Sequence, residues 1–323
     1  MLTQLQHSYC NITMYSTLQI TKLYNKFLMK YPRDFGSDTI SYRERLEIFQ
    51  ENVRIIEESN NENSTATYEI GKFADWNDEE LNAFSEPLPE PDRYVFRGYD
   101  YGWIYLISDG SSYPPRWDWR EKGGVTAVKN QSYKCNSCYA YAVTAVIESL
   151  YAIKYQRYIS ISEYEMLDCD YTNNGCKSGS IMRSLTRGKY IGFTQSVNYP
   201  TLLGNNYYCP LYGEIFINKL YQIDPDPNAI AWFVANVAPV ALNLAFPKRY
   251  KFYKSGVLPG TSECSTMEPN HAVEVIGYGI ENGKKYWLLK NSWGEGWGDQ
   301  GFFKIERGIN ACQVETYAAS ASL

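Results

Sequence analysis

The chain has 323 residues, of which 44% are hydrophobic and 21% are charged, and its formal net charge is −5. This composition indicates a folded globular protein, and the length allows two domains or one domain with a large additional segment. The sequence has no basic stripe, so we do not expect nucleic acid as a partner. It also has no run of about 18 apolar residues, so we expect no membrane span.

The first 24 residues lack the features of a secretory signal peptide, because they have no apolar core of about 7–15 residues and no small-residue cleavage site. Either the chain is not exported or its true start is missing. Residues 17–84 then show the periodicity of amphipathic helices. Within 42–60, apolar residues at spacings of four and three share one helical face: Tyr42, Leu46, Phe49, Val53 and Ile56.

Residues 86–115 differ in character, because five prolines and three glycines interrupt any regular element. We predict a linker between two units here. Residues 138–156 are largely apolar and predict a buried helix. From about residue 215, short alternating runs separated by Gly, Asn and Pro predict strands, namely 239–246, 271–279, 284–293 and 301–307. The second unit therefore has a helix-rich first half and a strand-rich second half, and we predict an α+β fold.

The eight cysteines are unevenly placed, with seven of them at position 135 or later. Six paired cysteines and one free thiol give a simple account of an odd number. Three disulfides would imply an oxidising compartment. The alternative, seven buried and reduced thiols, remains open at this point.

Three motifs contain the residue types of a cysteine nucleophile with its base. Cys138 opens the predicted buried helix, where the positive end of the helix dipole favours a thiolate. His271, in NHAVEVIGYG, is the one of the two histidines with a suitable setting, and Asn291 follows it in KNSWGEGWG. The CxxC spacing of Cys135 and Cys138 also fits a redox pair or half of a zinc site. However, no predicted strand precedes this motif and no second CxxC follows it.

The order and spacing of these motifs resemble the papain-family cysteine peptidases of the cathepsin L-like group, and the resemblance covers nearly the whole chain. It implies a papain-like two-domain fold, with a helical domain and a β-barrel-like domain behind a helical propeptide. It also implies a cysteine endopeptidase, a hydrolase made as a zymogen, which uses no cofactor and no metal.

The resemblance assigns a role to each motif residue. Cys138 matches the nucleophile, His271 the acid and base, and Asn291 the residue that orients the imidazole. Trp293 matches the indole that shields the bond between His271 and Asn291. Gln131 matches the side-chain donor of the oxyanion hole, whose other donor is the backbone N–H of Cys138. Nucleophile, base, orienting residue and fixed donors are what acyl transfer from a peptide requires.

The family pattern also selects one disulfide pairing from the 15 that six cysteines allow. It implies Cys135 with Cys176, Cys169 with Cys209, and Cys264 with Cys312, which leaves Cys138 as the free thiol.

The chain departs from the family pattern around the expected cleft. One additional residue separates Gln131 from Cys138, and Asn136 and Ser178 replace two glycines of the S1 cleft, so we expect their side chains to crowd the P1 residue. The S2 pocket is expected to be short and partly polar, with weaker preference for Leu or Phe at P2. The substrate-binding residues implied by the resemblance are Ser178, Gly179, Ser180, Ile181, Asn243, Ala272 and Tyr317.

The beginning of the chain resembles the inhibitory propeptide of the same family. One motif is matched by Arg45, Phe49, Asn52, Ile56 and Asn60, with Ser41 in place of the leading Glu, and a second by Gly71, Phe73 and Asp75. We therefore expect a propeptide and linker over residues 1–110 and a peptidase domain over 111–323. The helix-rich half is expected over about 120–212 and the strand-rich half over about 213–323. Cleavage is expected near 108–114, and Asn63 is a candidate glycosylation site.

The expected partners follow from the resemblance. They are protein or peptide substrates, the chain's own propeptide as inhibitor, and cystatin-like inhibitors, with a monomeric enzyme in the lysosome or outside the cell. The alternative function is a catalytically weak paralogue that acts as a binding or interaction protein, because the oxyanion loop and the S1 cleft are altered.

Overall fold

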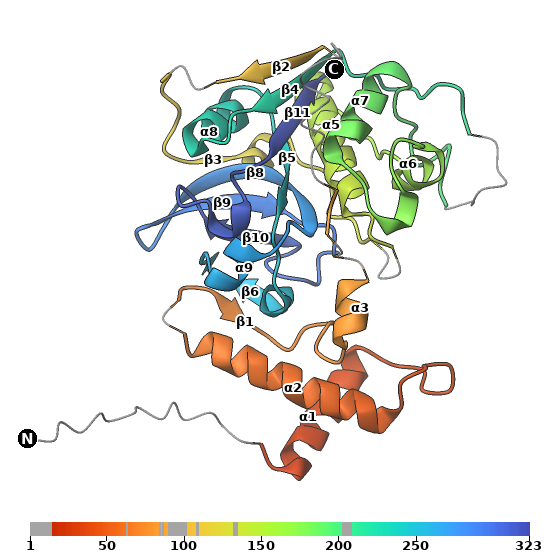
Figure 1. The fold of residues 1–323 in the computed structure, drawn as a ribbon, viewed down its shortest axis with the longest axis vertical. Helices are drawn as coiled ribbons and strands as arrows, with labels where there is room; N and C mark the ends of the chain where they lie inside the picture. The colour runs from red at the N-terminus through yellow and green to blue at the C-terminus, as the bar shows by residue number, and fades with distance from the viewer. Residues whose placement is uncertain are drawn as a thin grey trace, which may run out of the picture.

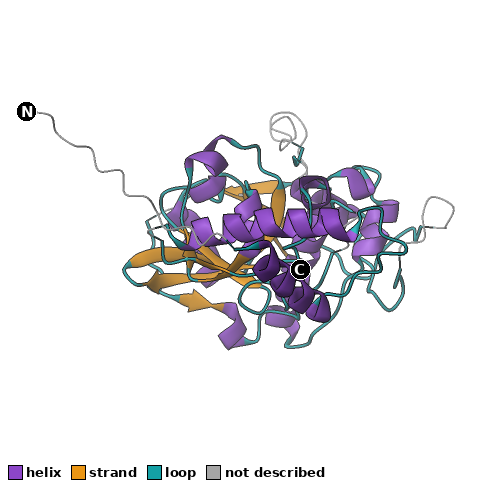
Figure 2. Ribbon diagram, turned by 90° about the horizontal axis from the view of Figure 1, so that it is seen from below, coloured by secondary structure: helices purple, strands orange, loops and turns teal. Residues whose placement is uncertain are grey.

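The computed structural model describes residues 15–62, 64–83, 85, 87–89, 102–107, 110–131, 135–201 and 209–323. Figure 1 shows three regions along the long axis of the molecule. The helices α1 and α2 lie at one end, below a large sheet, and α3 leads from them toward the rest of the chain. The helices α5, α6 and α7 lie beside the sheet at the other end. In Figure 2, seen from below, most strands gather toward one side of the molecule.

The N-terminal segment (residues 15–89) is built on two capped helices, α1 (Thr17–Lys30) and α2 (Tyr42–Asn60). Ser16 and Ser41 begin them with capping boxes, in which the serine oxygen and the residue at the third helical position satisfy each other's backbone N–H groups. The helices pack through a small apolar cluster of Ile20, Tyr24, Phe27, Phe49, Val53 and Ala74.

The expectation of helix throughout 17–84 is wrong between the helices, since 31–41 and 61–77 are not helical. The second gap contains the short strand β1 (Thr67–Tyr68), and α3 (Asp78–Asn82) follows it. The predicted buried face of α2 is also only partly correct, because Tyr42 is exposed.

The polar residues Arg45 and Asn52 are buried on α2 instead. The guanidinium of Arg45 pairs with Asp38 and Glu80. The side-chain amide of Asn52 donates to the carbonyl oxygens of Ala74 and Trp76 at 3.0 and 2.9 Å. These bonds pair the Arg45 guanidinium and the Asn52 amide nitrogen, and they fix the loop before α3 against α2. Asn52 Oδ1 has no hydrogen-bond partner among the described residues.

The helix-rich half is organised around α5 (Cys138–Tyr155), with α6 (Glu163–Cys169) and α7 (Ile181–Tyr190) packed against it. Most of the α5 side chains are buried, as the apolar run predicts. Two short 3₁₀ helices lie nearby, η1 (Trp119–Lys122) and η2 (Gly175–Lys177).

The strand-rich half forms a mixed sheet of nine strands within the described part of the chain, in the order β2-β4-β11-β5-β8-β9-β10-β7, with β3 paired to β8. The pairs β2–β4 and β10–β7 are parallel, and the others are antiparallel. The strands are β2 (Trp103–Leu106), β3 (Trp117–Asp118), β4 (Lys219–Ile223), β5 (Val240–Leu244), β7 (Val257–Leu258), β8 (His271–Glu281), β9 (Lys284–Lys290), β10 (Phe302–Glu306) and β11 (Ala318–Ser322).

Several further elements border this sheet. They are α8 (Pro227–Asn236), η3 (Lys248–Phe252), β6 (Tyr253–Ser255), α9 (Ser262–Thr266) and η4 (Ala311–Gln313). The strands β6 and β1 pair, which joins the N-terminal segment to the strand-rich half. The approach is close at Gly256 (φ +81°), where a Cβ atom would lie 1.9 Å from the carbonyl oxygen of Thr65. Only glycine fits there while the N-terminal segment is docked.

The predicted α+β class is confirmed. The strands β5, β9 and β10 fall within three of the predicted strands, and β8 begins at residue 271 as predicted but continues to Glu281. The sequence analysis did not single out α8, which is largely apolar, or β4 and β11, whose apolar residues do not alternate strictly. It also missed β2, which lies inside the predicted linker and nevertheless pairs with β4.

Glu274 of β8 provides a test of the buried sheet. Its carboxylate accepts a hydrogen bond from Ser149 Oγ at 2.7 Å, and burial raises its pKa to about 7. The folded chain therefore keeps a proton that the unfolded chain loses above pH 4.5, so this group lowers the free energy of unfolding as pH rises from about 4.5 to 7. Glu274→Gln should remove this loss. Between pH 4.5 and pH 7, the free energy of unfolding of the variant should rise by roughly 1–3 kcal/mol relative to that of its parent.

The measurement is guanidinium unfolding at both pH values in a Cys138→Ala background. Glu295→Gln is the matched control, because Glu295 is exposed and should leave the pH dependence unchanged. An equal pH dependence in Glu274→Gln and its parent would contradict the assignment.

Candidate active site

Cys138 is the first residue of α5, and its thiol is free and fully buried. Burial raises its pKa to about 12, although the backbone N–H groups of Ala272, Tyr139 and Cys138 itself oppose this shift by hydrogen bonding to the sulfur. The thiol donates to Asn136 Oδ1 at 3.7 Å. Cys138 is therefore a protonated thiol in this structure.

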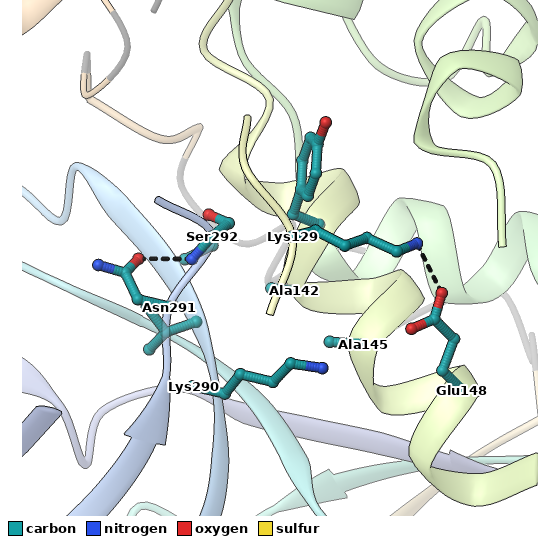
Figure 3. A pocket seen from close by; sticks show the side chains of 10 residues that line it. Lys129, Ala142, Ala145, Glu148, Lys290, Asn291 and Ser292 are labelled. Carbon is teal, nitrogen blue, oxygen red and sulfur yellow. Dashed lines mark hydrogen bonds and ion pairs between the residues drawn. The ribbon is translucent and has the colours of Figure 1, made fainter. Parts of the chain in front are cut away.

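His271 is the first residue of β8 and is also fully buried. Its Nε2 lies 2.7 Å from Asn291 Oδ1. The same oxygen accepts the backbone N–H of Ser292 at 2.8 Å, which Figure 3 draws as a dashed line. Because this atom is an acceptor, Nε2 must carry the imidazole proton and Nδ1 must carry the lone pair.

The environment of His271 keeps the imidazole neutral. Burial lowers its pKa to about 4, the bond to Asn291 raises it in part, and the charge of Lys251 lowers it further. Its Nδ1 has no hydrogen-bond partner among the described residues. A neutral imidazole with an unprotonated Nδ1 is the form that can accept a thiol proton.

Trp293 covers the bond between His271 and Asn291. The rings of Trp293 and His271 are 4.7 Å apart between centroids, and Phe246 packs against both of them. Trp297 packs edge-on against Trp293 with centroids 4.9 Å apart. This aromatic cluster keeps water from the hydrogen bond and restricts rotation of the imidazole.

Gln131 is buried, and its side chain is held by a residue that the sequence reading did not single out. Ser292 Oγ donates to Gln131 Oε1 at 2.5 Å, and the backbone N–H of Gln131 donates to the carbonyl of Ser292 at 2.8 Å. Since Ser292 holds the oxygen end of the amide, the nitrogen end points the other way, as an oxyanion donor requires. The only sequence signal for Ser292 was its place beside Asn291. Residues 132–134, in the loop that is one residue longer than the family pattern, lie outside the described residues, and so does Asn63.

The implied substrate-binding residues fall into two groups. Asn243 and Ala272 are paired between β5 and β8, and the register of Ala318 with Leu242 places Tyr317 beside Asn243. Asn243 Oδ1 is buried and has no hydrogen-bond partner among the described residues. The other group lies at the beginning of α7 and consists of Ser178, Gly179, Ser180 and Ile181.

Asn136 contacts the free thiol. Its side chain is buried in the full-length chain, its Oδ1 accepts from the Cys138 thiol, and its Nδ2 donates to the carbonyl of Lys177 at 3.4 Å. That Asn136 crowds the P1 residue stays a prediction. Gly179 is required by packing, since a Cβ atom there would lie 2.4 Å from the ring of Tyr139.

The three disulfides implied by the resemblance are present: Cys135–Cys176, Cys169–Cys209 and Cys264–Cys312. The first of them joins the loop before α5 to η2, so it ties the segment that contains Asn136 to the segment that leads to Ser178. The disulfide also removes the redox-pair reading of Cys135 and Cys138 in this structure. Within the described ranges, no three His, Cys, Asp or Glu side chains are grouped to hold a metal ion.

A group of buried charges lies behind the site, between α5 and the strands β8 and β9 (Figure 3). Lys129 Nζ is 2.6 Å from a carboxylate oxygen of Glu148 and 2.6 Å from one of Glu163. Both carboxylates also accept from other side chains or backbone groups. Because these charges are paired with one another, we read the cluster as support for α5 and not as a second reaction centre.

The N-terminal segment contacts the site first at Trp293. Lys72 Nζ donates to the carbonyl oxygen of Trp293 at 2.6 Å, and the Phe73 ring meets the Trp293 ring edge-on with centroids 5.4 Å apart. Burial lowers the pKa of Lys72 to about 8.

The segment then crosses between the two walls of the site. Ser178 Oγ donates to the carbonyl of Pro87 at 3.3 Å, and the backbone N–H of Leu88 donates to the carbonyl of Pro269 at 2.9 Å. Ser178 belongs to the helix-rich half, whereas Pro269 precedes His271 on the strand-rich half. Residues 87–88 therefore connect both halves, beside the fully buried Cys138 and His271.

None of the helices that the structure describes has the length and apolar character to cross a membrane. Comparison with known families matches residues 113–322 to the papain family cysteine proteases and residues 24–81 to the cathepsin propeptide inhibitor domain.

Proteins similar to this chain match it over both the N-terminal segment and the peptidase region. The viral cathepsin of Epiphyas postvittana nucleopolyhedrovirus is 33% identical over 95% of this chain and 94% of its own length. The pro-cathepsin H of Medicago truncatula is 33% identical over 90% of this chain and 83% of its own. Among solved structures, the digestive procathepsin L2 proteinase from Tenebrio molitor larval midgut has a TM-score of 0.85 at 31% identity, covering 94% of this chain and all of that one.

The two domain matches extend over the buried thiol and imidazole as well as over the segment that covers them. The chain thus belongs to the papain family and is a cysteine peptidase made as a proenzyme, with its own propeptide as inhibitor.

Proposed function

We propose that Cys138 is the nucleophile and His271 the general base and acid of a cysteine endopeptidase. The observation that carries this proposal is the hydrogen bond from Nε2 of His271 to Asn291, which leaves the lone pair of Nδ1 available for the thiol proton. The thiolate attacks the scissile carbonyl, the protonated imidazole gives its proton to the leaving amine, and water hydrolyses the thioester. Asn291 and Trp293 are positioning residues for His271.

We assign the oxyanion hole to the side-chain amide of Gln131 and the backbone N–H of Cys138. The bond from Ser292 to Gln131 Oε1 supports this assignment, because it fixes the orientation of the amide before substrate binds. Loss of one such donor costs about 3–4 kcal/mol of transition-state stabilisation.

The propeptide (residues 1–110) keeps this machinery inactive by excluding both substrate and water. With the cover in place, burial opposes the thiolate and the imidazolium alike. Removal of the cover admits water, and the two groups can then form the ion pair that such peptidases use. We place the boundary of the peptidase domain at residue 111, with cleavage near 108–114.

The setting of the mature enzyme follows from its chemistry. Three disulfides require an oxidising compartment, so we place the enzyme in the lysosome or outside the cell. We also propose that it works as a monomer and that cystatin-like inhibitors bind its cleft after the propeptide has left.

Epoxide labelling tests the catalytic assignment. A small epoxide that traps papain-family thiolates should label the acid-processed wild type at one site and should not label Cys138→Ser, because the hydroxyl is a far weaker nucleophile. Intact-mass spectrometry reads the added mass. The variant should keep the near-ultraviolet circular dichroism of the wild type. If correctly folded wild type takes up no label, the binding-protein alternative is correct instead.

The pocket lined by Asn243 and Tyr317 generates a second prediction. Because Asn243 Oδ1 is buried without a donor, a P2 side chain that donates a hydrogen bond should be preferred over Leu or Phe. Asn243→Val should raise kcat/KM for Leu at P2, relative to Thr, by roughly tenfold. The measurement is a P2 peptide-library profile.

Asn218→Val is the control. Asn218 is exposed directly before β4, so this variant carries the same substitution away from the pocket. A wild-type profile dominated by Phe at P2 would overturn this assignment of the pocket.

A further inference from the structure

The segment Lys248–Lys254, which contains η3 and the beginning of β6, carries four cationic side chains within seven residues. All four meet the propeptide. Lys248 Nζ lies 2.7 Å from Asp78 Oδ1, Arg249 pairs with Glu62, and Lys254 Nζ lies 3.1 Å from Glu69 Oε1. We call these four side chains, Lys248, Arg249, Lys251 and Lys254, the basic rim.

Lys251 is the member of the basic rim nearest to the reaction centre. It is 2% exposed, and its ammonium donates to the carbonyl of Leu81 and, at 2.7 Å, to Ser85 Oγ. Its charge is close enough to lower the pKa of His271. Its backbone carbonyl accepts the indole N–H of Trp297 at 2.8 Å, which ties η3 to the aromatic cluster over the imidazole.

The propeptide residues that bury Lys251 are the ones that must leave when the enzyme is processed. Leu81 and Ser85 both belong to the propeptide, and burial under them lowers the pKa of Lys251 to about 7. Once they have gone, water reaches the ammonium and the side chain regains an ordinary lysine charge at neutral and acidic pH. Processing therefore exposes a cation at the edge of the cleft.

The course of the propeptide separates this cation from Ser178 along the cleft. Residues 81 and 85 meet Lys251, and residues 87 and 88 then meet Ser178 and Pro269. A chain in the cleft consequently passes Lys251 and Ser178 at different points. Ser178 belongs to the side that we assign to P1, and we assign Lys251 to the opposite side, which holds the leaving amine, as part of the proposal that follows.

We propose that the basic rim of the processed enzyme recognises acidic side chains of protein substrates, on the residues that follow the scissile bond. The propeptide already demonstrates the complementarity, since Asp78, Glu62 and Glu69 occupy three of the four cations. A substrate carboxylate near Lys251 replaces the neutral acceptors Leu81 and Ser85 with a charged one, and a charged partner makes the stronger bond. This inference rests on the proposed peptidase activity of Cys138.

Two internally quenched peptides test the inference on enzyme processed from the full-length chain. They share every residue before the scissile bond and differ after it, where one has three Glu and the other three Gln. Mass spectrometry of the products confirms that the same bond is cut. The Glu peptide should have about tenfold higher kcat/KM at low ionic strength, and added salt should reduce the ratio.

Variants assign the effect to the basic rim. Lys251→Gln should bring the Glu-to-Gln ratio close to one, and Lys248→Gln, at a half-exposed position that tolerates the change, should lower it in part. Lys285→Gln is the matched control, since Lys285 is exposed on β9 and its loss changes the net charge equally. It should leave the ratio at the wild-type value.

Three results would overturn the inference. A wild-type ratio near one, or a ratio that persists in both Lys248→Gln and Lys251→Gln, rejects recognition by the basic rim. An equal gain from Glu placed before the scissile bond shows general attraction and not recognition after it. If neither peptide is cut and no epoxide label appears on Cys138, the proposed peptidase activity itself fails, whereas labelling of Cys138 together with a ratio near one rejects this inference alone.

Discussion

Cys138 and His271 are fully buried in the proenzyme, where residues 87–88 of the propeptide connect the two walls of the site. This burial sets the chemistry of the zymogen, because it raises the pKa of the thiol to about 12 and lowers that of the imidazole to about 4. Neither group is charged under the cover. The same imidazole is nevertheless already oriented by Asn291 and shielded by Trp293. Activation therefore consists of uncovering a prepared site and not of building one.

The cover depends on contacts that reach far along the chain. Arg45 and Asn52 of α2 hold the turn before α3, and α3 in turn leads to the residues that meet Lys251 and Pro269. The strand pair β1–β6 and the close approach at Gly256 anchor the other side. The acidic residues of the propeptide neutralise a basic rim that faces the expected position of the substrate. Inhibition and substrate recognition thus use the same surface in succession.

The residues that we propose as catalytic could be found in the sequence because each lies in a short motif of fixed spacing, and the strands around His271 alternate clearly. The environment of the site could not be predicted. Lys251 looks like an ordinary surface lysine in the sequence, and it is buried only because Leu81 and Ser85 fold over it. Asn136 accepts from the Cys138 thiol and donates to the carbonyl of Lys177, contacts that its place in the CxxC motif did not indicate. Arg45 and Asn52 are buried with their N–H groups bonded to partners that are distant along the chain, which periodicity alone does not encode.

Alkylation of Cys138 tests the central claim most directly. Iodoacetamide is added between pH 6 and 8, and peptide mapping by mass spectrometry follows the label on Cys138, apart from any on Cys10, in the full-length chain and in the processed domain. We expect the full-length chain to react at least about 100-fold more slowly, because a thiol with a pKa near 12 is almost entirely protonated and is also covered. Equal rates for the two forms would show that the propeptide does not keep the thiol dry and neutral.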